Sequence, residues 1–278
     1  MSIFIASINS GSNANCYYIG NKNEAVLIDA GLSCRETVKR IKRLGLDMQK
    51  VKAVFISHEH ADHISGIATL HKRFRLPVYI TPGTLANSNL VLQPDLILPF
   101  QKNKPIGIGN LRVTPFFKSH DANDPHSFMI SSNGLHVGVI TDIGHASGQV
   151  INCFRQCHAV FLEANYCENM LAKGQYPPAL KKRISSDKGH LSNTQALELF
   201  LKHKSEKLQL LILSHLSKNN NTPELVKELF TKHAGNVKIV IAGRYSETNV
   251  FAITHDENTP VQGVKKPTRK HENQLSLF

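Results

Sequence analysis

Residues 55–66 read FISHEHADHISG, and the six residues from His58 to His63 include three histidines, one glutamate and one aspartate. His58 and His60 are two positions apart, so on an extended backbone their side chains point the same way. Asp62 and His63 follow at the turn into a helical pattern and can face a second point nearby. Imidazole nitrogens with a carboxylate suit Zn²⁺, Mn²⁺ or Fe²⁺. The stretch therefore predicts a metal centre where a strand turns into a helix.

Three more ligand-type residues stand at the ends of apolar strand patterns: His120, Asp142 and His215. Strand ends gather at one edge of a sheet, so residues distant in sequence can meet there. One metal needs three protein ligands and an open position, whereas two metals about 3.5–4 Å apart need roughly twice as many and a bridge. A single histidine at a strand end is commonly an ordinary hydrogen-bonded side chain. Seven ligand-type residues in such positions favour a metal centre.

Strand and helix patterns interleave through most of the chain. Strands are predicted at 3–8, 15–20, 25–31, 51–57, 111–120, 127–134, 135–144, 159–165, 208–215 and 237–243, and helices at 34–45, 64–74, 192–204 and 222–233. This order predicts an α/β class with layered sheets. We expect one domain over residues 1–256. Residues 257–278 are polar and basic until the last five, which predicts a flexible tail.

The charge and cysteine content narrow the kind of protein. Lysine and arginine number 33 against 21 acidic residues, a formal charge of +12, which favours a polyanionic partner such as nucleic acid or anionic lipid. No apolar run approaches a membrane span and no signal peptide is recognisable. Five cysteines cannot form a complete disulfide framework. We therefore expect a cytoplasmic protein with reduced thiols and no membrane association.

The segment HEHADH matches the pattern HxHxDH and resembles the signature of the metallo-β-lactamase fold, whose other motif positions occur in order within residues 1–255. The resemblance implies a single αββα sandwich with two divalent metal ions, Zn²⁺ or Mn²⁺, at one edge of its sheets. It implies that each ion is held by one of two triads: His58, His60 and His120, and Asp62, His63 and His215. Asp142 would bridge the ions, and Asp29 would brace the cluster loop.

Two further residues fit a general acid and its partner. Glu163 ends a strand pattern in FLEAN, and His190 precedes a helix in GHLSNTQA. This run, with LSHLS after it, resembles the ribonuclease Z group, which implies that His190, paired with Glu163, protonates the leaving oxygen. An alkoxide leaving group needs an acid, and a carboxylate partner favours the protonated imidazole. Asp62 would also orient the attacking water. The alternative is that Glu163 and His190 have only structural roles, with His190 near the helix N-cap Ser192.

Longer phrases resemble the YycJ/WalJ family of bacterial metallo-β-lactamase-fold proteins: SGSNANCYYIG, HEHADHISG, SHDANDPHSF, TDIGHAS and LSHLSKNNN. The resemblance implies a metal-dependent exonuclease that degrades DNA from its 5′ end in DNA repair. Two positions depart from the family pattern: Ala14 replaces a glycine, and Tyr166 stands where a histidine is usual. The substrate contacts near Tyr166 are therefore left open.

Substrate contacts are expected from a loop of small residues and from basic side chains. Ser10, Ser12 and Asn13 could cradle a phosphate through backbone N–H groups, or could simply form a tight turn between two strands. Arg244, Lys188 and the cluster 181–183 could contact the nucleic-acid backbone, although each alone could be a solvated surface charge. Salt-sensitive binding would follow from such contacts.

The chain ends in QLSLF after a basic stretch. This pentapeptide resembles the motif with which proteins bind the bacterial sliding clamp, and the resemblance implies that four of its residues dock there: Gln274, Leu275, Leu277 and Phe278. An apolar segment after a linker can insert into a partner's groove. The alternative is a short strand or helix end that packs on the domain itself.

These features and the resemblances together imply a binuclear metal-dependent phosphodiesterase, a 5′→3′ DNA exonuclease recruited by the sliding clamp. Two alternatives stay open. One is a hydrolase of the same fold that acts on RNA or on a small phosphodiester or ester. The other is a clamp-bound module whose metal site is not catalytic. The ligand set favours an enzyme, because structural zinc sites are usually closed tetrahedra that contain cysteine.

Overall fold

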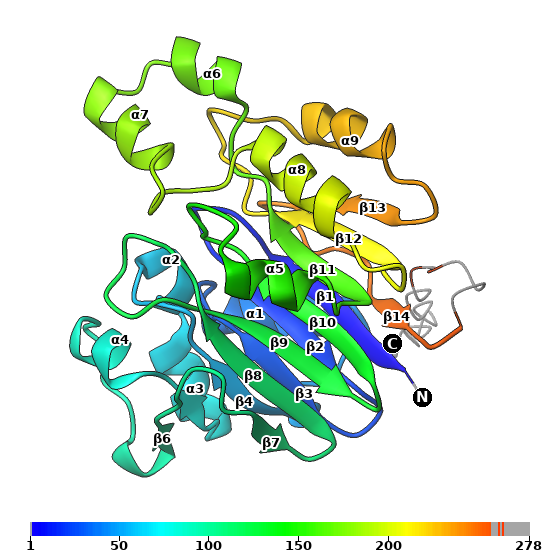
Figure 1. Ribbon diagram of the computed structural model, residues 1–278. Coiled ribbons are helices and arrows are strands. Elements are labelled where there is room, and N and C mark those ends of the chain that lie inside the picture. Colours follow the sequence, from blue (N-terminus) through cyan, green and yellow to red (C-terminus); the bar gives the residue numbers. More distant parts are fainter. Residues whose placement is uncertain (1, 257–260, 262, 264–278) are drawn as a thin grey trace, which may run out of the picture.

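Two seven-stranded sheets pack face to face in the computed structural model, which describes residues 2–256, 261 and 263 (Figure 1). The first sheet runs β14 (Phe251–Ile253), β1 (Ile3–Asn9), β2 (Cys16–Gly20), β3 (Ala25–Ile28), β4 (Val51–Phe55), β5 (Val78–Tyr79) and β6 (Ile97–Leu98). The second runs β13 (Lys238–Ile241), β12 (Leu210–Ser214), β11 (Ala159–Glu163), β10 (Leu135–Ile140), β9 (His126–Ser132), β8 (Leu111–Phe117) and β7 (Ile106–Ile108).

Each sheet is half parallel and half antiparallel. Strands β3 to β6 pair in parallel in the first sheet, and β10 to β13 do so in the second. The remaining pairs, β14–β1–β2–β3 and β7–β8–β9–β10, are antiparallel. The carboxyl ends of the parallel strands carry the long excursions of the chain, so the side chains that follow these strands can collect at one edge.

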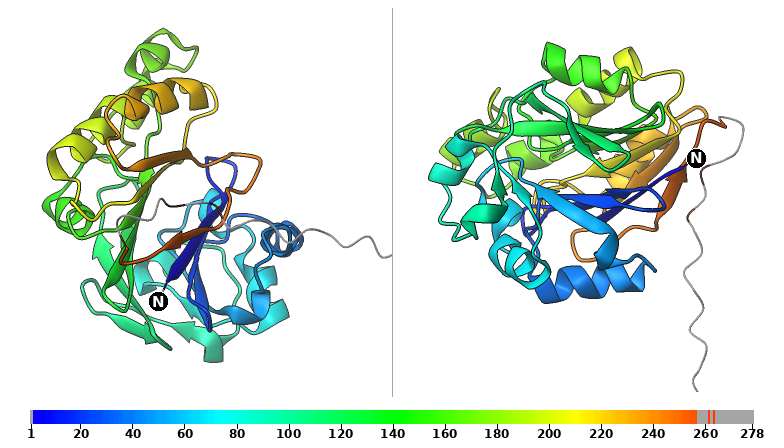
Figure 2. Two further views of the ribbon diagram at one scale, coloured as in Figure 1. Left: turned by 90° about the vertical axis from the view of Figure 1, so that its right-hand side faces the viewer. Right: turned by 90° about the horizontal axis from the view of Figure 1, so that it is seen from below.

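Helices cover the outer face of both sheets (Figure 2). The helices are α1 (Cys34–Arg43), α2 (Ala61–Ile64), α3 (Ile67–Phe74), α4 (Pro82–Ala86), α5 (Gly148–Phe154), α6 (Glu168–Lys173), α7 (Pro178–Ile184), α8 (Asn193–His203) and α9 (Pro223–Thr231), with short 3₁₀ turns η1 (Met48–Lys50) and η2 (Pro94–Leu96). Helices α1 and α3 pack on the first sheet, and α5, α8 and α9 pack on the second. The predicted αββα sandwich is confirmed.

Three apolar layers explain why the strands read as continuous apolar runs. In β1, Ile3 and Ile5 face the core between the sheets, whereas Ala6 and Ile8 face the helices outside. Both faces of such a strand are buried, so its sequence loses the usual alternation. Phe55, Phe128 and Phe161 fill the central layer.

The predicted helix over residues 64–74 is wrong in one respect. The structure has two helices here, α2 and α3, separated by Ser65 and Gly66. A Cβ atom on Gly66 would lie 1.7 Å from the carbonyl oxygen of Leu32, so only glycine permits this crossing. The predicted helix at 192–204 is confirmed as α8, and Ser192 caps it in a reciprocal capping box with Gln195.

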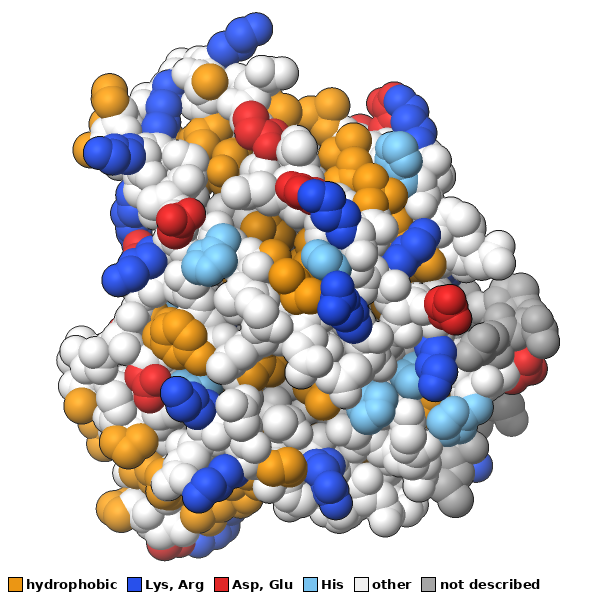
Figure 3. Space-filling view, in the orientation of Figure 1, with side chains coloured by type: hydrophobic (Ala, Val, Ile, Leu, Met, Phe, Trp, Pro, Cys, Tyr) orange, Lys and Arg blue, Asp and Glu red, His pale blue; other side chains and the backbone are white. Residues whose placement is uncertain are grey.

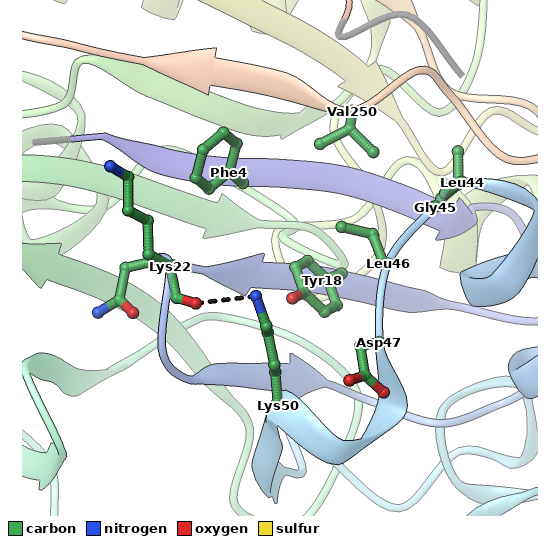
Figure 4. Close-up of a pocket in the computed structure, with 10 residues that line it drawn as sticks. Phe4, Tyr18, Lys22, Leu44, Gly45, Leu46, Asp47, Lys50 and Val250 are labelled. Carbon is green, nitrogen blue, oxygen red and sulfur yellow. Dashed lines mark hydrogen bonds between the residues drawn. The ribbon is translucent and has the colours of Figure 1, made fainter. Parts of the chain in front are cut away.

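A shallow groove of about 470 Å³ lies on the outer face of the first sheet (Figure 4). Phe4 and Tyr18 form its floor, and residues 44–47 form one wall. Lys50 donates a hydrogen bond of 2.8 Å to the carbonyl oxygen of Lys22 across it. None of the predicted site residues lines this groove. Within the part of the chain that the structure describes, no helix has the length and apolar character needed to cross a membrane.

Candidate metal centre

The predicted ligands all lie just beyond strand ends. Residues 58–63 follow β4, His120 follows β8, Asp142 follows β10 and His215 follows β12. Asp29 follows β3 in the same way, and Glu163 is the last residue of β11. His60 and Asp62 are partly exposed, and the other predicted ligands, with Asp29 and Glu163, are buried.

The backbone turns sharply at three of these positions. Asp29, Asp142 and His215 have φ angles of 61°, 55° and 56°. Non-glycine residues seldom adopt this left-handed conformation, and such residues cluster at functional sites. At each position the chain leaves its strand within one or two residues, so the side chain is held at the sheet edge.

Three imidazoles converge on one point. His60 Nδ1 lies 3.0 Å from His58 Nε2 and 3.3 Å from His120 Nε2. Ligand atoms about 2.1 Å from a tetrahedral ion are about 3.4 Å apart, close to these separations. Burial lowers the pKa of His58 well below its ordinary value and lowers that of His120 to about 3. Neutral imidazole is the form that ligates a metal.

The second predicted triad also comes together. Asp62 Oδ2 lies 3.4 Å from both His63 Nε2 and His215 Nε2. Asp142 stands between these histidines, with Oδ2 at 3.3 Å from His63 Nε2 and Oδ1 at 3.3 Å from His215 Nδ1. Burial disfavours protonation of His215, but the neighbouring carboxylates of Asp142, Asp62 and Glu163 raise its pKa to about 10.

The donor set fits a pair of divalent cations. Asp142 Oδ2 is buried and makes no hydrogen bond with the described residues, although His63 Nε2 lies 3.3 Å from it. It also groups with His58 and His63 within ligand distance, so it faces both triads. Five imidazoles and two carboxylates, one of which has an oxygen without a hydrogen bond, match the needs of two metal ions with a bridge.

Asp29 and Ser57 orient the ligating rings. Ser57 donates to Asp29 through its backbone N–H and its hydroxyl, both at 2.8 Å. His63 Nδ1–H donates to Asp29 Oδ2 at 2.7 Å, and His58 Nδ1–H donates to Ser57 Oγ at 2.8 Å. With their Nδ1 atoms occupied, both rings present Nε2 to the centre, as ligating histidines usually do.

Replacing Asp29 by asparagine is expected to weaken metal binding about 10- to 100-fold. Asparagine tolerates the left-handed backbone, but its amide NH₂ replaces one of the two accepting oxygens. Competition with a chelating dye measures the affinity. Asp47→Asn is the matched control, because Asp47 caps only an exposed turn. Equal affinity of Asp29→Asn and wild type would show that Asp29 does not brace the centre.

A glycine lets the cluster loop sit tightly against the loop after β3. Asn15 N–H donates to the carbonyl oxygen of Asp62 at 2.7 Å, and Ala30 N–H donates to that of His63 at 2.8 Å. A Cβ atom on Gly31 would lie 1.8 Å from the Asp62 carbonyl oxygen. The position of the cluster loop therefore depends on Gly31 as well as on the ligands themselves.

Glu163 and His190 form the predicted pair. His190 Nδ1–H donates to Glu163 Oε1 at 2.7 Å, and the His190 side chain is 22% exposed. Its ring centroid lies 5.2 Å from that of His120 and 5.3 Å from that of His215, so the ring stands between the two triads. Burial disfavours ionised Glu163, but His190 and His215 outweigh it and lower the pKa of Glu163 to about 2. Glu163 therefore fixes the orientation of the ring.

The loop of small residues makes hydrogen bonds within the protein itself. Ser10 is buried, and its hydroxyl accepts a hydrogen bond of 2.8 Å from the backbone N–H of His215. Ser12 and Asn13 are exposed, and their side chains accept hydrogen bonds from Arg244 at 3.1 and 3.2 Å. Ser10 thus supports the candidate ligand His215, while exposed Ser12 and Asn13 bind the partly buried Arg244. Tyr166, the departure from the family pattern, is buried.

Two polar residues that lie at the centre were not predicted from the sequence. Asn15 Nδ2 lies 3.0 Å from both Asp62 Oδ2 and His63 Nε2. Lys118 is fully buried, and its Nζ donates to the carbonyl oxygen of Thr141 at 2.9 Å. Burial lowers the pKa of Lys118, while carboxylates of the site oppose this effect. The only sequence signal for Lys118 was a lysine that follows an apolar strand.

The comparisons with known proteins agree with this geometry. A family model described as beta-lactamase superfamily domain matches residues 24–215, which include the ligands of both triads. The chain belongs to the metallo-β-lactamase superfamily. It is accordingly a metal-dependent hydrolase of that superfamily.

Individual relatives cover most of the chain. Exodeoxyribonuclease YycJ of Bacillus anthracis is 32% identical over 230 residues, 82% of this chain and 87% of the relative. Exodeoxyribonuclease WalJ of Streptococcus pneumoniae is 30% identical over 221 residues, 78% and 82% of the two chains. The crystal structure of the metallo-β-lactamase-fold protein YhfI from Bacillus subtilis superposes with a TM-score of 0.70 at 16% identity, covering 91% of this chain and all of that one. The resemblance to the YycJ/WalJ family is confirmed.

Proposed function

We propose that this protein is a binuclear metal-dependent phosphodiesterase that removes nucleotides from the 5′ end of DNA. The observation that carries the proposal is the Glu163–His190 pair, 2.7 Å apart and placed between the two ligand triads. The relatives named exodeoxyribonucleases support DNA as the substrate. A formal charge of +12 is also suited to a polyanion.

Each residue of the centre has a distinct part in this chemistry. Two bound divalent ions, Zn²⁺ or Mn²⁺, would lower the pKa of water and neutralise charge on the phosphate oxygens. Asp62, the least buried carboxylate ligand, orients the attacking water through its oxygens. His190, held by Glu163 through Nδ1, uses its Nε2 to protonate the departing 3′ oxygen.

A general acid that is fixed in place favours a phosphodiester, whose leaving group is poor, over substrates with better leaving groups. A sugar alkoxide is a poor leaving group, so cleavage of its P–O bond gains from protonation. A thiolate leaves readily without an acid. The buried partner Glu163 also accepts backbone N–H bonds from Ile143 at 2.8 Å and Leu191 at 3.2 Å, so the pair is rigidly placed. A rigid acid is what the departing alkoxide requires.

Recruitment by the sliding clamp is part of the proposal. The motif 274–278 lies outside the residues that the structure describes, and its sequence alone supports the idea. A tail that binds the clamp would raise the local concentration of the nuclease at replicating DNA.

Replacing Leu275 and Phe278 together by alanine is expected to weaken clamp binding at least tenfold, because apolar anchors supply most of the energy of a short docked peptide. Surface plasmon resonance on immobilised clamp measures this. Ser276→Ala is the matched control within the same motif. Cleavage of a short oligonucleotide without clamp should be unchanged in both. Undiminished clamp binding by the double variant would contradict recruitment through this motif.

A further inference from the structure

The proposed general acid His190 follows α7, a helix that packs weakly on the rest of the protein. The structure describes all seven residues of α7, and none of them is buried. Helices α6 and α7 project from the sandwich (Figure 1), and lysine and arginine side chains (blue) follow the same part of the surface (Figure 3). A segment with few buried apolar contacts opens easily. On this side, the position of His190 therefore depends on polar contacts.

The chain on the other side of His190 is firmly held. Leu191 N–H donates to Glu163 Oε2 at 3.2 Å, and the carbonyl oxygen of Leu191 accepts a hydrogen bond of 2.9 Å from Asn165 N–H. The next residue, Ser192, caps α8. Any displacement of the His190 ring would therefore start from residues 185–189, which connect α7 to it.

A tight turn joins α7 to His190. His190 N–H donates to the carbonyl oxygen of Ile184 at 2.8 Å, and Gly189 N–H donates to that of Ser186 at 2.8 Å. A Cβ atom on Gly189 would lie 2.2 Å from the Ile184 carbonyl oxygen, so the turn requires glycine there. These bonds fix His190 to the end of α7, and the turn must be held by other contacts if His190 is to stay over the centre.

Two carbonyl oxygens of this turn bind the loop that carries the candidate ligand His120. Ser119 Oγ donates to the carbonyl oxygen of Asp187 at 2.7 Å, and His120 Nδ1–H donates to that of Gly189 at 3.0 Å. Exposed His145 also donates to the Asp187 carbonyl oxygen, at 3.1 Å. The shortest of these three bonds comes from Ser119, which makes it the main anchor of the turn.

Two further contacts hold the turn against the same edge of the sandwich. Arg183, near the end of α7, forms an ion pair with Asp121, the residue after His120. A Cβ atom on Gly144 would lie 2.1 Å from the Asp187 carbonyl oxygen, so the two backbones touch. The Arg183 side chain is 60% exposed, and exposed ion pairs contribute little, so this pair should matter less than the bond from Ser119.

We propose that Ser119 and Arg183 are positioning residues for the general acid, because they anchor the turn that places the His190 ring between the two triads. The inference rests on the proposed function, since it requires His190 to act as the acid. A catalytic group misplaced by about 1 Å can lower a rate on the order of 10²-fold. A substrate whose leaving group needs no proton should be insensitive to this anchor.

The test compares variants of the full-length, metal-loaded protein on DNA and on bis(p-nitrophenyl) phosphate. Ser119→Ala is expected to lower kcat on DNA about 10- to 100-fold but on the ester less than about threefold, with unchanged metal content. Ser119→Thr keeps the hydroxyl and should restore turnover of DNA. Arg183→Ala should show the same contrast with a smaller loss. The matched control is Ser185→Ala, because exposed Ser185 donates only to the Lys181 carbonyl oxygen.

Hydrogen exchange followed by mass spectrometry tests the anchor without turnover. In the substrate-free protein, Ser119→Ala should speed exchange of the Gly189 and His190 amides at least about tenfold, whereas Ser185→Ala should not. Unchanged exchange in Ser119→Ala, or an equal loss of turnover on both substrates, would overturn the proposal. If wild type itself leaves DNA intact, the nuclease assignment fails, and the exchange result alone decides whether Ser119 anchors the turn.

Discussion

Asp142→Asn is expected to lose at least one metal ion per chain and to lower kcat/KM on an oligonucleotide on the order of 10³-fold. Asp142 lies within ligand distance of His58 and His63, one from each triad, and its Oδ2 makes no hydrogen bond with the described residues. Asparagine fits the φ of 55° at this position, so the change removes charge without disturbing the backbone. Inductively coupled plasma mass spectrometry on dialysed protein counts the metals.

The matched control is Asp187→Asn. Asp187 contributes only its backbone carbonyl oxygen to Ser119 and His145, and its side chain is exposed. This variant should keep full metal content and full activity. If Asp142→Asn also kept two metals and wild-type turnover, Asp142 would not be the bridging ligand, and the assignment of both triads would need revision.

His190→Ala is expected to lower kcat on DNA about 10²- to 10⁴-fold, the usual contribution of a general acid. Metal content should stay at the wild-type level, because His190 Nδ1 faces Glu163. The loss should shrink to less than about tenfold with bis(p-nitrophenyl) phosphate, whose phenolate leaves without protonation. Glu163→Gln should show the same dependence on the leaving group, with a smaller loss, because the ring remains. Steady-state kinetics on both substrates measures the contrast.

His145→Ala is the control for His190. His145 is an exposed histidine near the same rim, and its Nδ1 donates to the carbonyl oxygen of Asp187. It should leave both substrates unaffected. An equal loss by His190→Ala on DNA and on the p-nitrophenyl ester would mean that His190 positions a ligand or a metal rather than acting as the acid.

The convergence of the candidate ligands was predictable from sequence because most of them follow shortly after a recognisable apolar strand. His120, Asp142 and His215 are separated by many residues, but each follows a strand, and sheet edges bring strand ends together. Within the cluster 58–63, His58 and His60 are two positions apart, and this spacing places their side chains on the same side of an extended backbone. The αββα layers followed from the same interleaved pattern.

Other features depend on tertiary packing, which leaves no recognisable pattern in the local sequence. Lys118 resembles a surface lysine in sequence, but the second sheet and the cluster loop bury it. Strands β5 and β6 have only two residues each, too few for periodicity to show.

The central claim is that the metal-loaded protein hydrolyses DNA from its 5′ end. The direct measurement uses chelated protein, single-stranded DNA labelled at either end, and a matching RNA, with Mn²⁺, Zn²⁺ or Mg²⁺ added back. The account predicts release of the 5′ label as a mononucleotide when a suitable ion is present, none with chelator, and none by Asp142→Asn. DNA that stays intact with every ion, from protein that binds two metals per chain, would contradict the nuclease assignment.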